Sequence, residues 1–129
     1  MPFAVSTVST IGKAVAAILS KPAETANKEL YIASFITTQN EILAALEKAT
    51  GKKYNITKTT TSETFGQGHI KMDKGESAEG FRDVLRVSTY GKGHGNDFGG
   101  NATLSNDLLG LPKEDLYTVT EKVVEGEDV

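Results

Sequence analysis

The sequence predicts an α/β fold in which a partial Rossmann-like sheet is covered by helices. Three observations carry this prediction: a capped amphipathic helix between two β-prone runs, a third such run near the N-terminus, and a length of 129 residues that suits one domain. The runs are Phe3–Ser6, Glu29–Ser34 and Tyr54–Thr59. Strand, helix and strand in this order are typical of a βαβ unit, whose two strands are parallel.

The first predicted helix follows the Phe3–Ser6 strand. Thr10 is placed to cap it, and apolar side chains recur at the helical spacing i, i+4, i+7 and i+8, namely Ile11, Val15, Ile18 and Leu19. Pro22 is expected to end this helix, because the residue before a proline is forced out of the helical conformation.

The helix between the two later runs has the clearest signals. Thr38 and Glu41 form a capping box, in which the Thr38 hydroxyl accepts from a free amide and Glu41 reaches back to the helix start. The apolar face consists of Ile42, Ala45, Leu46 and Ala49. Gly51 supplies the left-handed residue that commonly ends a helix.

The second half of the chain is predicted to be more irregular. The polar, β-prone run Thr57–Thr64 is interpreted as an edge strand. Further elements are helices at Glu76–Ser88 and Lys113–Val124, a glycine-rich loop at Tyr90–Gly100 and an apolar turn at Asn106–Pro112. We therefore expect a single domain over residues 1–124 and an acidic disordered tail over residues 125–129.

The composition excludes several function classes. Without Cys the chain forms no disulfide, thiolate metal site or iron–sulfur cluster. Its net charge of −3 argues against nucleic-acid binding, which needs a concentrated basic face. The apolar runs are too short to cross a bilayer, and no basic residue precedes the first of them as in a secretory signal. We expect a cytoplasmic protein without membrane contact.

The glycine-rich stretch from Gly91 to Gly100 does not match a nucleotide-binding loop. A dinucleotide loop has the pattern G-x-G-x-x-G between a strand and a helix. Here the sixth position is Asn96 counted from Gly91 and Phe98 counted from Gly93. The residues themselves therefore assign no cofactor-binding site, and we interpret the stretch as a surface loop.

Three side chains are candidates for contact with a small-molecule substrate: His69, Tyr90 and His94. Imidazole titrates near neutral pH and loops often carry binding groups, which favours His94. The alternative is that both histidines, flanked by glycine, are simply exposed and that Tyr90 is half-buried packing. The histidines are too few and too far apart for a metal site, and no residue is assigned a catalytic role. The adjacent carboxylates Glu114 and Asp115 are interpreted as helix-start residues that interact with the helix dipole.

Three segments resemble the NmrA-like and isoflavone-reductase-like family. Residues 7–22 are similar to its stretch V-x-x-x-D-I-G-x-A-V-A-x-x-L-x-x-P, although Thr10 stands where many family members carry an Asp. Residues 37–53 resemble its helix T-x-N-E-I … T-G-K-K, and Asn106–Leu116 is similar to its C-terminal end. Together the three segments span nearly the whole chain.

The resemblance implies an NAD(P)-binding Rossmann protein, an atypical relative of the short-chain dehydrogenases. In that family the nucleotide loop and the catalytic Lys lie in an N-terminal portion, whereas the matched segments belong to the C-terminal, substrate-side lobe. The resemblance therefore implies NAD(P) for a full-length protein and no cofactor for this chain alone. It also implies that the chain is a truncated gene product or a partial paralogue.

The expected function is that of the C-terminal, substrate-side part of an NmrA-like NAD(P)-dependent oxidoreductase-type protein, inactive alone. One alternative is a non-enzymatic NmrA-like regulatory or dinucleotide-sensing protein, and another is a small protein-interaction domain. Because a missing portion would leave apolar helix faces uncovered, we expect the chain to associate with itself or with a partner chain.

Overall fold

The computed structural model describes residues 2–93 and 103–129. Its contacts divide the chain into two compact units. The sheet unit consists of Pro2–Tyr54 and Asp97–Val129, and the hairpin unit consists of Asn55–Asn96. None of the helices in the described part of the chain has the length and apolar character that a membrane crossing needs.

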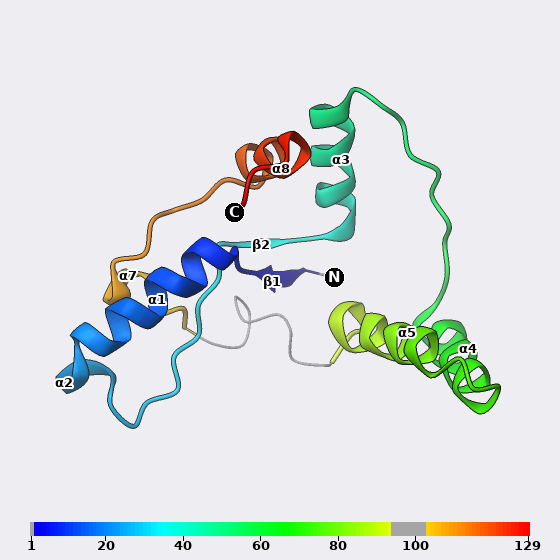
Figure 1. The fold of residues 1–129 in the computed structure, drawn as a ribbon, viewed down its shortest axis with the longest axis horizontal. Coiled ribbons are helices and arrows are strands. Elements are labelled where there is room, and N and C mark those ends of the chain that lie inside the picture. Colours follow the sequence, from blue (N-terminus) through cyan, green and yellow to red (C-terminus); the bar gives the residue numbers. More distant parts are fainter. Residues whose placement is uncertain (1, 94–102) are drawn as a thin grey trace. The chain divides into compact units, whose positions relative to one another are not determined.

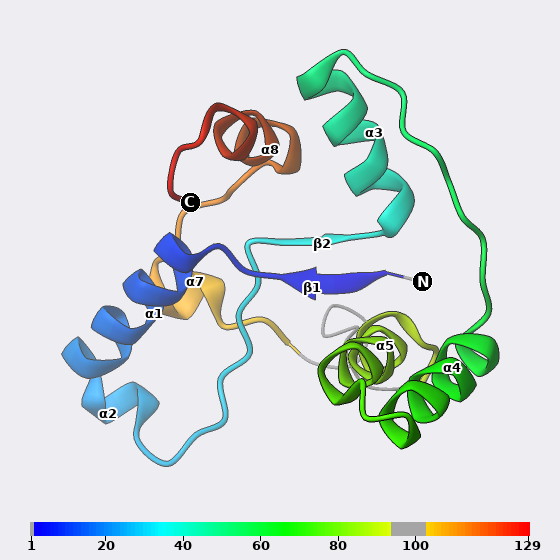
Figure 2. The ribbon, with the colours of Figure 1, turned by 45° about the vertical axis from the view of Figure 1, so that its right-hand side comes forward.

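The sheet unit is built on two short antiparallel strands (Figure 1). β1 (Phe3–Val5) pairs with β2 (Phe35–Thr37), with Phe3 opposite Thr37. The helices of this unit are α1 (Val8–Ser20), α2 (Pro22–Thr25), α3 (Gln39–Thr50), α7 (Asn106–Leu109) and α8 (Leu116–Glu125). α3, which directly follows β2, packs beside α8 (Figure 2). The predicted α/β class is thus confirmed as a small sheet with packed helices.

The sheet differs from the predicted βαβ arrangement in direction and position. The run Glu29–Ser34 is not a regular strand: Tyr31 forms an isolated parallel bridge with Leu104, and β2 begins only at Phe35. The Asn106 side chain takes the place of a neighbouring strand, since its Oδ1 accepts from the Ala33 N–H at 3.2 Å and its Nδ2 donates to the Ala33 carbonyl at 2.7 Å.

The strand predicted at Tyr54–Thr59 was wrong. Residues 51–60 have no regular secondary structure and all are exposed. The two apolar side chains of the run, Tyr54 and Ile56, also face solvent. A β-prone sequence forms a strand only where it can pack against a neighbour, and this segment has none.

In the sheet unit, both ends of α3 and the C-terminal end of α1 lie where the sequence predicts them. The starts of α1 and α8 differ from the prediction. The capping box of Thr38 and Glu41 is present, and Gly51 ends α3 with φ +67°. α1 ends before Pro22, as predicted, but it begins three residues early. Its cap is Thr7 and not Thr10, and the Thr7 hydroxyl accepts from the Thr10 N–H at 3.1 Å. α8 begins at Leu116 rather than Lys113, because its cap is Asp115.

The C-terminal residues 125–129 lie within the described part of the chain. Glu125 ends α8, and Gly126 follows in the left-handed conformation. The Val129 carbonyl accepts a hydrogen bond of 3.0 Å from the Val8 N–H at the start of α1. The extent of the domain, residues 1–124, stays a prediction.

The hairpin unit consists of α4 (Thr61–Asp73) packed against α5 (Ser77–Tyr90). α5 was predicted, but the edge strand at Thr57–Thr64 was wrong, since Thr60 and Glu63 form a second capping box that starts α4. The two helices approach each other closely at Gly68 and Gly80, where a Cβ on Gly80 would lie 2.4 Å from the Gly68 carbonyl oxygen.

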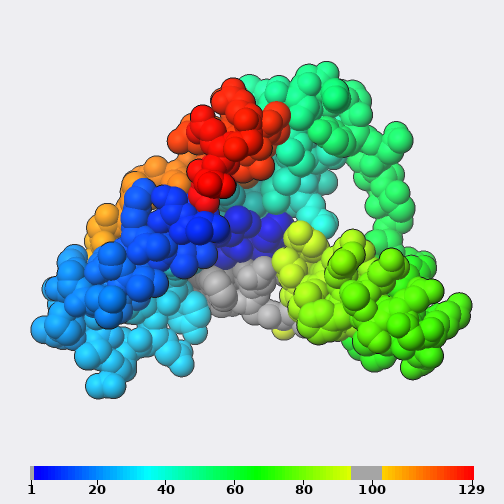
Figure 3. Space-filling model, in the orientation of Figure 1, coloured from blue at the N-terminus to red at the C-terminus, as the bar shows by residue number. Residues whose placement is uncertain are grey.

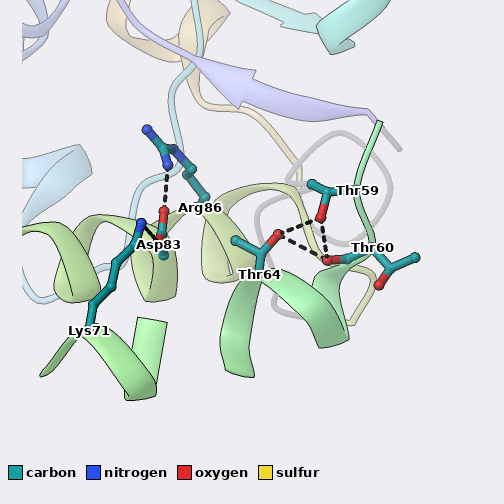
Figure 4. Close-up of polar contacts among 6 residues, drawn as sticks. All are labelled: Thr59, Thr60, Thr64, Lys71, Asp83 and Arg86. Atoms are coloured by element: carbon teal, nitrogen blue, oxygen red, sulfur yellow. Dashed lines mark hydrogen bonds and ion pairs between the residues drawn. The ribbon is translucent and has the colours of Figure 1, made fainter. Parts of the chain in front are cut away.

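An ion-pair cluster joins the two helices of the hairpin unit (Figure 4). The Asp83 carboxylate on α5 is buried and accepts from Lys71 Nζ on α4 at 2.7 Å. Arg86, one turn further along α5, donates to the other carboxylate oxygen at 2.5 Å. The hydrogen bond from Lys71, together with the two positive charges, lowers the pKa of Asp83 against the opposing effect of its burial.

Candidate functional site: the Glu114 pocket

The start of α1 places two hydroxyl groups against one carboxylate. Thr7 caps the helix, and Thr10, one turn later, points inward and is fully buried. Both hydroxyls donate to Glu114 Oε2 at 2.8 Å, although 107 and 104 residues separate them from Glu114 in sequence. This cluster ties the segment before α8 to the first turn of α1.

Ser34 completes the cluster from the segment before β2. Its hydroxyl oxygen accepts from the Thr7 N–H at 3.0 Å, and its own N–H donates to the Val5 carbonyl at 2.8 Å. The Ser34 hydroxyl also helps to lower the pKa of the Glu114 carboxyl. Residues from two distant segments of the chain, the start of α1 and the segment before β2, therefore meet at Glu114.

The Glu114 carboxylate is held in its ionised form. Its partial burial raises the pKa, but the hydrogen bonds from Ser34, Thr10 and Thr7 outweigh that effect, and the positive charge of Lys13 adds to them, so the pKa of Glu114 lies below its usual value. At neutral pH the group is an acceptor of hydrogen bonds and a poor donor of protons.

A pocket of about 280 Å³ opens beside this cluster. Its walls are formed by β2, the first turn of α3 and the start of α8, and they consist of Phe35, Ile36, Thr37, Glu41, Glu114, Asp115, Leu116 and Tyr117. Tyr117 lies on the rim next to α3, where Lys48 Nζ is 4.8 Å from the centre of its ring. The pocket thus combines an apolar wall with three carboxylates.

The two other carboxylates of the pocket also have lowered pKa values. Glu41 accepts from the Thr38 N–H at 2.7 Å, which is the main cause of the lower pKa of its carboxyl. Asp115 accepts from the Thr118 N–H at 3.0 Å, with the same effect on its pKa. The residues that line the pocket thus contribute three ionised carboxylates and no Lys or Arg, which disfavours phosphate or carboxylate groups, and the nearby cations are Lys48 over the Tyr117 ring and Lys13, whose charge acts on Glu114.

Two of the candidate substrate contacts from the sequence, His69 and Tyr90, are not among the residues that line this pocket. His69 lies on α4 and is exposed, with its ring edge against Phe65 at a centroid distance of 4.5 Å. Tyr90 is the last residue of α5. His69 is next to Gly68, which packs on Gly80. Tyr90 lies ten residues after Gly80 on α5, about 15 Å along the helix. His69 and Tyr90 therefore do not share a site. His94 lies outside the described residues. Their roles stay predictions.

Sequence reasoning missed Glu114. Its neighbour Asp115 was correctly placed at a helix start, but Glu114 turns the other way, toward the hydroxyls. No local signal reveals this, because its partners lie on segments far away in the sequence. In residues 2–93 and 103–129, no group of three or more His, Cys, Asp or Glu side chains is arranged to hold a metal ion.

The chain is similar to two fungal proteins. It is 29% identical over 121 residues to a protein named oxidoreductase aprR of Aspergillus flavus, a match that covers 94% of this chain and 40% of that protein. It is 28% identical over 125 residues to one named oxidoreductase poxI of Penicillium oxalicum, with coverages of 95% and 40%. The chain therefore spans about 40% of the length of the curated relatives it matches. No family model matches it, and no solved structure matches it significantly.

Proposed function

We propose that this chain is the substrate-side part of an NmrA-like, NAD(P)-dependent oxidoreductase-type protein and that it binds no dinucleotide alone. The observation that carries the proposal is the match to two proteins named as oxidoreductases, which takes in nearly all of this chain and only 40% of theirs. An α/β unit with helices packed on a small sheet is compatible with one part of such a protein.

The residues present do not fit a dinucleotide. The pyrophosphate of NAD(P) is held by backbone amides of a glycine-rich turn at a helix N-terminus, and the stretch from Gly91 to Gly100 lacks that spacing. The Glu114 pocket offers three ionised carboxylates instead, which repel a pyrophosphate. We therefore assign no step of hydride transfer to this chain.

The pocket favours a different kind of ligand. An apolar wall with ionised carboxylates at its edge suits an uncharged or positively charged organic molecule, whose hydroxyl or amine groups donate to the carboxylates. In the proposed protein this pocket contacts the part of the substrate that does not react. The three carboxylates of the pocket are ionised at neutral pH and therefore do not donate a proton.

Calorimetric titration of the purified chain with NADH and NADPH tests the proposal. We expect no saturable heat with either dinucleotide. A chimaera in which this chain replaces the matched 121 residues of the Aspergillus flavus relative is the companion sample, and we expect it to bind a dinucleotide, with the unaltered relative titrated beside it as the reference. Saturable micromolar binding by the isolated chain would overturn the proposal, and so would a folded chimaera that binds none.

A further inference from the structure

An apolar stripe lies on the outer face of α1. Val8, Ile11, Val15 and Leu19 are 77%, 47%, 53% and 76% exposed. At 100° per residue these four positions fall on one side of the helix, and Lys13 falls on another. Figure 3 shows part of α1, in blue, uncovered at the surface. α1 therefore buries its small and polar side and exposes its large apolar side chains.

The interior of the sheet unit explains this orientation. The side chains that α1 buries are Thr10 and Ala14, and the rest of the buried set is also mostly alanine and threonine. Thr10 is needed inside, because its hydroxyl donates to Glu114. Once the Thr10 side faces inward, the stripe must face outward, and its exposure costs about 25 cal/mol per Å² of apolar surface.

The stripe resembles the face that one helix presents to another in a packed pair, with a glycine among apolar side chains. Gly12 lies within it, and a Cβ at Gly12 would meet no atom within 4 Å. The hairpin unit shows what a glycine on a packed helix face looks like: a Cβ at Gly68 would lie 2.9 Å from the Gly80 carbonyl oxygen. The depression at Gly12 is thus open where another helix could approach closely.

The size of the stripe indicates what covers it. A helix of 13 residues is about 20 Å long and about 10 Å wide. Its one face has a footprint of about 200 Å², whereas stable complexes between separate chains bury about 800 Å² on each partner. A second copy of this chain held by α1 alone would have a small interface for a stable complex. A domain joined covalently needs no such area, because the linkage supplies a high effective concentration.

We propose that the outer face of α1 packs against a helix of the dinucleotide-binding domain of the oxidoreductase proposed above. This inference rests on the proposed function. It is supported by the relatives, in which 60% of the length lies outside the match and is continuous with the matched segment. The uncharged stripe centred on Gly12 and Val15 is the docking surface, and it excludes water when the two parts meet.

The absence of Cys allows a direct test by thiol labelling. Val15→Cys probes the stripe, and Val123→Cys on α8 is the matched control, since Val15 and Val123 are 53% and 51% exposed. Each substitution is made in the isolated chain and in the chimaera described above. Iodoacetamide is the reagent, and the labelled peptide is quantified by mass spectrometry. Melting curves first confirm that both variants fold as the parent chain does.

In the isolated chain, positions 15 and 123 should react at similar rates. In the chimaera, labelling at position 15 should slow by roughly tenfold or more, because a packed side chain reacts only when the structure opens locally. Labelling at position 123 should not change. If positions 15 and 123 are labelled at equal rates in a chimaera that binds a dinucleotide, the proposal that α1 is a docking surface is wrong. The proposed function would then be unaffected.

Two further outcomes would also overturn the inference. If position 15 of the isolated chain becomes protected as the protein concentration rises, a second copy covers the stripe. If the folded chimaera binds no dinucleotide, the proposed function itself fails, and the inference fails with it.

Discussion

The two units each hold one carboxylate between separate elements, but with different kinds of partner. In the hairpin unit, Asp83 is neutralised by the cations Lys71 and Arg86, and the longer of the two contacts spans 12 residues of chain. In the sheet unit, Glu114 is held by neutral hydroxyls, and its contact with Thr7 spans 107 residues. The first arrangement can form within one helical hairpin, whereas the second forms only when both ends of the chain have folded together.

The same contrast holds for glycine. Gly80 is buried against α4, whereas Gly12 faces open space on α1. In the hairpin unit, the glycine lies inside the contact between two helices. In the sheet unit, Gly12 lies on a helix face that no other described element covers. Each of the following variants tests one side of this comparison.

Gly80→Ala should have the largest effect. The new Cβ would lie 2.4 Å from the Gly68 carbonyl oxygen and 2.6 Å from Met72 Cγ, and the backbone oxygen cannot move aside as a side chain can. We expect a loss of about 3 kcal/mol, the upper range for overpacking. Amide exchange of α4 and α5 measures it.

Gly12→Ala is the matched control for Gly80→Ala. Its Cβ meets nothing within 4 Å, and alanine is the better helix former, so the isolated chain should gain up to about 1 kcal/mol in the amide exchange of α1. Equal losses at both glycines would mean that the measured cost does not arise from helix packing.

Glu114→Ala should destabilise the sheet unit by about 2 kcal/mol, because the buried hydroxyls of Thr7 and Thr10 lose their acceptor. Glu114→Gln retains an acceptor oxygen and should cost less. Chemical denaturation of the two variants gives the comparison. A loss confined to α4 and α5 would contradict the assignment of Glu114 to the sheet unit.

The pH dependence of Glu114 has a definite sign. Because its folded-state pKa lies below the reference value of 4.5, the group adds stability that is fully present above that value and is lost as pH falls through the folded-state pKa. The stability difference between the parent chain and Glu114→Gln should therefore be constant near pH 7 and shrink in acid. Denaturation series at several pH values test this, and a difference that grows in acid would refute it.

The costs of removing the charge of Asp83 and of Glu114 should depend differently on salt concentration. The cations around Asp83 are partly exposed, so added salt screens them and should reduce the cost of Asp83→Asn. Glu114 is held mainly by uncharged hydroxyls, with the charge of Lys13 as a smaller contribution, so the cost of Glu114→Gln should change less with salt. The same denaturation assay at low and high NaCl measures both, with amide exchange assigning each loss to its unit.

The sequence predicted the local features of this fold and missed the distant ones. The cap and end of α3 were correct, because Thr38, Glu41 and Gly51 act within one helix. The start of α1 was misplaced, because Thr7 and Thr10 have equal capping chemistry and Glu114, far away in sequence, decides between them. The interrupted pairing of Glu29–Ser34 likewise depends on Asn106, 73 residues beyond Ala33.

The site shows the same limit more strongly. Glu114 and its pocket combine residues from three segments, and no spacing rule connects them. The second capping box, Thr60 with Glu63, could have been found, since it repeats the pattern of Thr38 with Glu41. It was overlooked because the surrounding threonines favour a strand on average, and a specific pair of hydrogen bonds overrides that average.

The two capping boxes provide the last and smallest test of the comparison, since each unit contains one. Thr38→Ala and Thr60→Ala each remove an oxygen that accepts from the N–H of the following Glu, at 3.3 and 3.2 Å. Each should cost about 1 kcal/mol, read from amide exchange in α3 and α4 respectively.

Thr37→Ala is a poor substitute for Thr38→Ala, because Thr37 is buried and its loss also removes packing. Equal costs would show that the units differ in their distant contacts and not in their helix caps. A much larger loss at Thr60 would mean that the hairpin unit depends on its cap to fold, since it has little buried core behind α4 to replace it.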